Sequence, residues 1–98
     1  MIIQTLDRTP NGDYERITIT NAVVSRLDAD YRDGPKAVFV TIEDVAIRYR
    51  IDGGDPDANE GHYVAAGGNL YFVDPASIRQ LRMISTGANA TAIVTYYN

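Results

Sequence analysis

The chain has no cysteine and no tryptophan, and among its 98 residues it has only one lysine and one histidine. Without cysteine it forms no disulfides, and the usual zinc-binding frameworks are excluded. Small extracellular domains often depend on disulfides, so their absence favours a cytosolic origin or a place in an assembly. The formal charge of −4 and the scattered arginines argue against nucleic acid as a partner, because binding to a phosphate backbone needs clustered Lys and Arg.

The sequence also has no segment typical of export or of membrane insertion. Residues 1–8 contain no basic stretch followed by an apolar core, which is the pattern of a signal peptide. No apolar run approaches the roughly 20 residues that a membrane-spanning helix needs. We therefore expect a protein that is made without an export signal and has no membrane partner.

Alternating apolar and polar residues dominate what the chain does contain. A period of two is typical of β-strands that turn one face to the core and the other to solvent. Turn-forming residues, chiefly Gly with Asn, Asp or Pro, separate the alternating segments at the spacing expected between strands. The pattern predicts an all-β fold, a single antiparallel β-sandwich of six or seven strands, with strands at residues 17–24, 38–43, 47–52, 70–73, 81–85 and 91–97.

Two segments fall outside the strand pattern. Residues 75–80 are expected to form one short helical turn, because Asp74 suits the N-cap position and Pro75 suits the first helical position. Residues 1–14 are expected to form an arm or an edge strand, while residues 15–98 form the sandwich domain. An arm that docks on a neighbouring subunit would do so through its apolar residues, Ile2, Ile3 and Leu6.

The acidic turn that follows the strand at 47–52 raises the question of a metal. Asp55, Asp57 and Asn59 have the spacing of the first three oxygen ligands of an EF-hand calcium loop. The match ends there, because Glu60 stands where the loop needs glycine and Ala66 stands where it needs a bidentate glutamate. We therefore predict no metal and no cofactor, with calcium at the three turn residues as the alternative.

No set of residues predicts catalysis. The single histidine, His62, has no nucleophile near it in the sequence and is expected on the surface or at a strand edge. The candidate carboxylates lie in turns, whereas an active site needs titratable groups paired in a cleft. We therefore expect no catalytic residues and a protein that is not an enzyme.

Three of the seven tyrosines are candidates for contact with a protein partner. Tyrosine is enriched at interfaces because it has an apolar body with a polar tip, although it also packs well within sheets. Tyr31 lies in a polar loop, and Tyr96 and Tyr97 lie at the end of the sequence. We expect these three at an interface and the other four in the core or on a sheet face.

Charged residues around the strand at 47–52 are further candidates for the interface. Arg48 and Arg50 alternate with apolar residues, so they lie on the charged face of this strand. On that face they would meet solvent, a carboxylate such as Glu43 on a neighbouring strand, or an acidic partner. Asp55 and Asp57, in the turn that follows, are candidates for the same contact.

The segment Ile-Arg-Tyr-Arg-Ile-Asp-Gly-Gly-Asp-Pro, residues 47–56, resembles the strand and turn of fibronectin-type-III-associated and chitobiase C-terminal β-sandwich modules. With Gly61 and the segments 81–84 and 91–97, it is also similar to small structural proteins of tailed bacteriophages. The first resemblance implies a sandwich like that of immunoglobulin or fibronectin type III domains. The second implies a protein of the virion, made in the cytoplasm of the host.

The phage resemblance implies a capsid decoration (cement) protein, which stabilises the shell by bridging neighbouring subunits. Its partners would be major capsid or tail subunits, and it would form a homo-oligomer, a trimer or a dimer. A tail or head–tail connector component is one alternative. A carbohydrate-binding accessory module is an alternative of another class, and it would need an exposed platform of aromatic residues.

Overall fold

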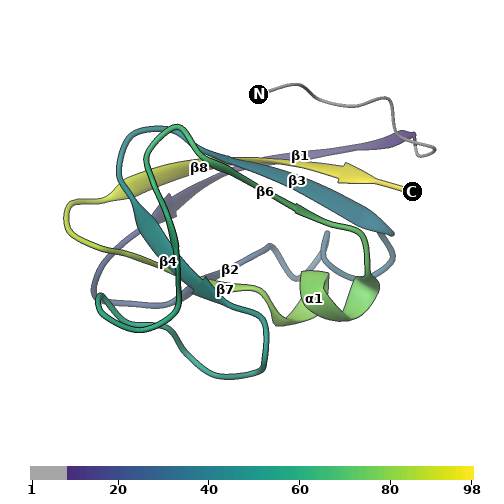
Figure 1. The fold of residues 1–98 in the computed structure, drawn as a ribbon. Coiled ribbons are helices and arrows are strands. Elements are labelled where there is room, and N and C mark those ends of the chain that lie inside the picture. Colours follow the sequence, from purple (N-terminus) through teal and green to yellow (C-terminus); the bar gives the residue numbers. More distant parts are fainter. Residues whose placement is uncertain (1–8) are drawn as a thin grey trace.

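The computed structural model describes residues 9–98, which form mostly β-structure with one short helix (Figure 1). Strand residues recur with the period of two seen in the sequence, and the strands alternate between buried and more exposed positions. In chain order the elements are β1 (Pro10–Ile19), β2 (Ser25–Arg26), β3 (Ala37–Ile42), β4 (Ile47–Arg50), β5 (His62–Val64), β6 (Asn69–Phe72), α1 (Pro75–Gln80), β7 (Arg82–Ser85) and β8 (Ala90–Tyr97).

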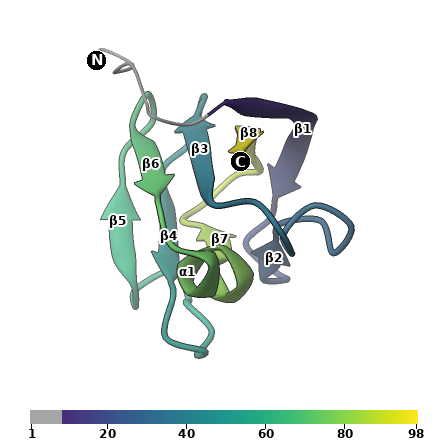
Figure 2. The same cartoon turned by 90° about the vertical axis from the view of Figure 1, so that its right-hand side faces the viewer.

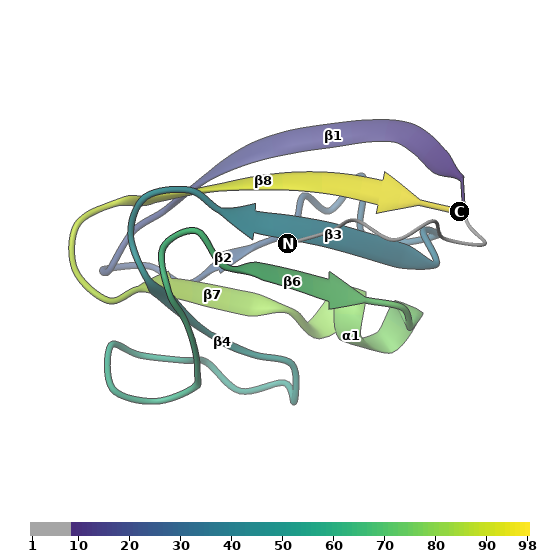
Figure 3. The same cartoon turned by 45° about the horizontal axis from the view of Figure 1, so that its top comes forward.

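The strands form two antiparallel sheets of four strands each. The first sheet has the order β1-β8-β3-β6, which Figure 3 shows side by side, and the second has the order β2-β7-β4-β5. Strands are paired as in one long folded hairpin: β4 with β5, β3 with β6, β2 with β7 and β1 with β8. Two further pairings, β8 with β3 and β7 with β4, complete the sheets.

This strand order differs from the immunoglobulin-like order implied by the motif at 47–56. In an immunoglobulin sandwich the first and second strands are neighbours in one sheet. Here β1 and β2 belong to different sheets, and β1 pairs with the last strand. The local motif was therefore a poor guide to topology, because a strand and its turn do not determine which strands become neighbours.

The two sheets share one hydrophobic core. In β8 every second residue is buried, and the same holds for β3, so both strands turn one face inward. Val40 and Val94 of the first sheet and Ile47 and Met83 of the second are fully buried in a single cluster. Burying such a side chain contributes about 1.5–3 kcal/mol, so this cluster is the main source of stability.

The strand expected at 17–24 ends earlier than predicted. β1 stops at Ile19, and the hydroxyl oxygen of Thr20 then accepts hydrogen bonds from the backbone N–H groups of Ala22 (3.4 Å) and Val23 (3.2 Å). Ser and Thr form such turns through their side chains, which ends the strand. Val23 is consequently 68% exposed although it is apolar.

The N-terminal boundary expected at residue 14 falls inside a strand. β1 begins at Pro10 and pairs with β8 along the edge of the first sheet, so residues 10–14 form the start of an edge strand, one of the two forms expected for this segment. The register shifts between Pro10 and Tyr14, and such an irregularity is common in edge strands. Ile2, Ile3 and Leu6 lie outside the described residues.

The predicted helical turn at 75–80 is confirmed. α1 spans Pro75–Gln80, with Pro75 in its first turn, and the carboxylate of Asp74 accepts a hydrogen bond of 3.0 Å from the backbone N–H of Ser77. Figure 2 shows α1 at one end of the two sheets. Ile78 anchors the helix in the core. Among residues 9–98 no helix has the length and apolar character needed to cross a membrane.

The described part of the chain contains eight strands, against the six or seven predicted. The two that the sequence pattern missed are β2 and β5, which have two and three residues. Alternation cannot be recognised over so few residues, and both are defined by pairing with longer neighbours.

Candidate functional site

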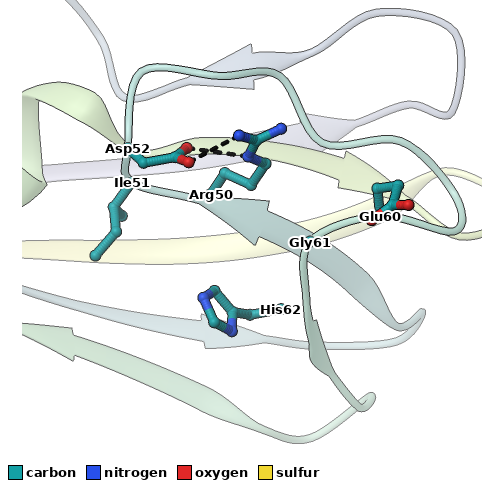
Figure 4. Close-up of a pocket in the computed structure, with 6 residues that line it drawn as sticks. All are labelled: Arg50, Ile51, Asp52, Glu60, Gly61 and His62. Carbon is teal, nitrogen blue, oxygen red and sulfur yellow. Dashed lines mark hydrogen bonds and ion pairs between the residues drawn. The ribbon is translucent and has the colours of Figure 1, made fainter.

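The loop between β4 and β5, residues 51–61, is held by the two arginines of β4, and Figure 4 shows the pairing of one of them, Arg50, with Asp52. Arg50 donates two hydrogen bonds to the carboxylate of Asp52, at 3.0 and 2.7 Å, and a third of 3.3 Å to the carbonyl of Asp55. The same carboxylate accepts a hydrogen bond of 3.2 Å from the backbone N–H of Gly54. We call residues 51–61 the acidic loop. Its first turn is organised around one arginine.

Arg48 holds the far end of the acidic loop. Its guanidinium donates to the carbonyls of Ala58 and Gly61, both at 3.0 Å, and lies 5.3 Å from the ring centre of Tyr63. Of the alternatives considered for these arginines, pairing with Glu43 is not observed, since both bind the acidic loop. Glu43 instead accepts a hydrogen bond from Thr41. The acidic loop folds back over β4 and supplies the acceptors that Arg48 and Arg50 bind.

The three turn residues considered for calcium are bonded within the protein. Asp55 forms an ion pair of 2.8 Å with Arg82 on β7. Asp57 accepts a hydrogen bond of 2.8 Å from the backbone N–H of Asn59, which is the usual turn geometry for this residue type. Within residues 9–98 no three His, Asp or Glu side chains are grouped so that they could hold a metal ion.

A surface pocket of about 340 Å³ lies between the acidic loop and the start of β5. His62 lines it at the edge of the second sheet, where the sequence placed a strand-edge histidine, and its ring centre lies 5.1 Å from that of Tyr49. The volume is at the lower limit of small-molecule sites. The pocket is lined by Arg50, Ile51, Asp52, Glu60, Gly61 and His62, a set without a serine, threonine or cysteine nucleophile.

The acidic loop makes stability depend on pH. The hydrogen bonds from Arg50 and from the Gly54 backbone lower the pKa of Asp52 from 3.8 to about 2. A depressed pKa adds stability that is complete above the unfolded value and is lost as pH falls through the folded value. We therefore expect the urea midpoint of the wild type to fall between pH 4 and pH 2 more than that of Asp52→Asn. Parallel profiles for the two proteins would contradict the role given to this carboxylate.

The three tyrosines expected at an interface have different environments. Tyr96 is fully buried, so the expectation that it contacts a partner is wrong. It has the same parity in β8 as Val94, and that face of the strand turns into the core. Tyr31 is half-buried and packs on Tyr96 with ring centres 5.6 Å apart. Tyr97 has the opposite parity and is partly exposed.

The hydroxyl of Tyr96 donates a hydrogen bond to the carboxylate of Glu15 on β1. The same carboxylate accepts a hydrogen bond of 3.1 Å from the backbone N–H of Asp28. Burial raises the pKa of Tyr96 well above its usual range, and the hydrogen bond to Glu15 raises it further. Tyr96 is thus a neutral core residue that joins the last strand to the first.

A second surface, which the sequence reading missed, lies on the outer face of the first sheet. Tyr14, Thr95, Phe39 and Tyr71 are successive partners across β1, β8, β3 and β6. Tyr14 is 60% exposed and Tyr71 is 39% exposed. We call Tyr14, Phe39 and Tyr71 the aromatic row. It could not be recognised in the sequence, because its members come together only through the pairing of distant strands.

The face around the aromatic row carries little charge. Neighbouring outward positions on β8 and β3 hold Ile93, Thr41 and Tyr97. We consider the outward positions at which β1, from Tyr14 onward, β8, β3 and β6 are paired. Among these described positions Arg16 is the only charged residue. A face with exposed aromatic rings and few charges is unlike an ordinary solvated surface and is typical of an interaction site.

No protein-family model, no curated protein and no solved structure matches this chain. The resemblance of residues 47–97 to phage structural proteins therefore stays a prediction. The two surfaces, the acidic loop with its arginines and the aromatic row, are the structural basis on which a function can be proposed.

Proposed function

We propose that the two sheets form a jelly-roll β-sandwich. Jelly rolls are built from eight strands in two sheets, and they occur in viral capsid proteins and in lectins. The pairing as one long hairpin, closed by β8 with β3 and β7 with β4, supports this assignment. The proposal replaces the immunoglobulin-like topology and brings the fold close to two of the functions considered from the sequence.

We propose that the protein is a non-enzymatic structural component of a tailed-phage virion, most simply a capsid decoration protein. The observation that carries the proposal is the aromatic row on an almost uncharged sheet face. Interface cores are enriched in Tyr and Phe and depleted in charged residues, which is the composition of this face. In this role the outer face of the first sheet binds the shell and adds buried area across the joints between major capsid subunits.

The alternative partner is a tail or head–tail subunit, and the protein is expected to act as a dimer or trimer.

Mass spectrometry of particles made by the genome that encodes the chain tests where in the virion the protein is located. Copies in the head fraction support decoration, and copies in the tail fraction support the connector alternative. Absence from both fractions would refute the virion role.

Removing the exposed rings of the aromatic row should abolish docking without unfolding the domain. We expect Tyr14→Ala with Tyr71→Ala to weaken co-sedimentation with capsids by at least about tenfold, since a few aromatic residues usually carry most of the binding energy. Tyr63→Ala is the matched control, because Tyr63 is 59% exposed but lies on the second sheet. Equal weakening by the control would contradict docking through the first sheet.

The same aromatic row favours a second candidate, a carbohydrate-binding accessory module. Exposed tyrosine rings can stack on sugars, and jelly rolls include lectin domains. A glycan array separates the two proposals. Binding to a polysaccharide that is lost in Tyr14→Ala supports the carbohydrate module, and an array without hits contradicts it.

A further inference from the structure

Three arginines stand side by side on the outer face of the second sheet. Arg26 on β2 is the direct partner of Arg82 on β7, and Arg82 is the direct partner of Arg50 on β4. We call these three residues the arginine row. Neighbouring strands lie about 4.8 Å apart, and like charges directly opposite each other destabilise a sheet. The arrangement therefore has a cost unless anions offset the charge.

The acidic loop supplies carboxylates to two of the three arginines. Asp52 pairs with Arg50 at 2.7 Å, and Asp55 pairs with Arg82 at 2.8 Å. Within residues 9–98 Arg26 has no ion pair, and its guanidinium donates to the carbonyl of Arg79 at 2.5 Å. A carbonyl offsets less charge than a carboxylate does, so the β2 end of the arginine row keeps its excess positive charge.

Two further observations show that Arg26 and Arg82 are the arginines whose charge or donors are incompletely paired. Partial desolvation lowers the pKa of Arg26, and the charges of Arg32 and Arg82 lower it further. In Arg82 the Nε atom is buried and has no hydrogen-bond acceptor. Buried donors are nearly always paired, and an exception calls for an explanation. Here Arg26 lacks a carboxylate partner, and the adjacent Arg82 has one donor without an acceptor.

We propose that Arg26 and Arg82 form a binding site for a small oxyanion, a phosphate group or a carboxylate. The planar guanidinium presents paired donors that match the oxygens of both groups. An oxyanion between the two residues relieves their mutual repulsion and gives Arg26 the anionic partner that it lacks within residues 9–98. The ion pairs of Asp52 and Asp55 keep the neighbouring guanidinium groups in place. The site lies on the sheet opposite the aromatic row and does not depend on the proposed function.

NMR titration of the arginine Nε–H signals tests the site on the intact chain. Sodium phosphate and sodium acetate are titrated separately, each against sodium chloride at equal ionic strength. We expect saturable shifts at Arg26 and Arg82 that chloride does not reproduce. Saturation by phosphate alone identifies a phosphate site, saturation by acetate alone a carboxylate site, and saturation by both a general oxyanion site. Saturation by neither overturns the proposal.

Two variants with the same change of charge make the test specific. Arg26→Gln should weaken binding by about tenfold or more, because it removes a charge-assisted hydrogen bond. Arg16→Gln, on the first sheet, should leave binding unchanged. Thermal unfolding in chloride provides the check on folding, and there Arg26→Gln should be at least as stable as Arg16→Gln, since it removes repulsion within the arginine row. Unaltered oxyanion binding by Arg26→Gln would refute the site.

Discussion

Replacing Tyr96 by alanine is expected to destabilise the isolated domain by about 3–5 kcal/mol, as truncation of a large buried aromatic side chain usually does. Tyr96 is fully buried, packs against Tyr31 and donates its hydroxyl hydrogen bond to Glu15. The loss is large against the total of about 5–15 kcal/mol that small domains have. Urea unfolding followed by tyrosine fluorescence or circular dichroism measures it.

The adjacent residue provides the control for this prediction. Tyr97 has the opposite parity in β8 and is partly exposed, so Tyr97→Ala should change the free energy of unfolding by no more than about 1 kcal/mol. Tyr96→Phe keeps the ring and removes only the hydroxyl, which separates packing from the hydrogen bond to Glu15. Similar losses for Tyr96→Ala and Tyr97→Ala would show that Tyr96 is not a core residue.

The second large effect is expected at Gly61, where the acidic loop enters β5. Its φ of +119° is one that side chains rarely adopt, and a Cβ there would lie 3.0 Å from the carbonyl oxygen of Tyr49 and 3.2 Å from the Cβ of Pro56. The backbone conformation alone costs about 1–3 kcal/mol for a residue with a side chain. Because the contact with Tyr49 is with backbone, Gly61→Ala should lose more stability than the conformation explains.

Comparison with Gly67→Ala separates the steric part of this loss from the conformational part. Gly67 also has a positive φ, of +82°, but a Cβ there has no heavy atom within 4 Å. We expect Gly67→Ala to carry only the conformational cost and Gly61→Ala to be clearly less stable in the same urea titration. In Gly61→Ala the hydrogen bond from Arg48 to the Gly61 carbonyl should also weaken. Equal losses in the two variants would contradict the close approach to Tyr49.

The sequence predicted strands well wherever alternation is long. The cores of β3, β4, β7 and β8 lie inside predicted segments, and the helical turn at 75–80 follows from its cap. Topology could not be predicted, because period-two patterns tell which face of a strand is buried but not which strand lies beside it. The immunoglobulin-like expectation was carried by one strand and its turn, and that information is local.

The parity of β8 could have corrected the assignment of Tyr96. Ala92, Val94 and Tyr96 alternate with Ile93 and Thr95, so the sequence already placed Tyr96 on the inward face. For Arg48 and Arg50 the shared face was predicted, but their partners were not, since those come from a loop that folds back.

The place of β8 within the first sheet has a consequence for how the protein is made. β8 lies between β1 and β3, which have no pairing with each other, and Tyr96 joins Glu15 across 81 residues of sequence. Until β8 is available, β1 has no partner in the first sheet and only β3 with β6 can pair there. Such distant contacts slow folding, and the unpaired edges are prone to aggregation. The first sheet therefore cannot be completed until β8 has been made and has inserted between β1 and β3.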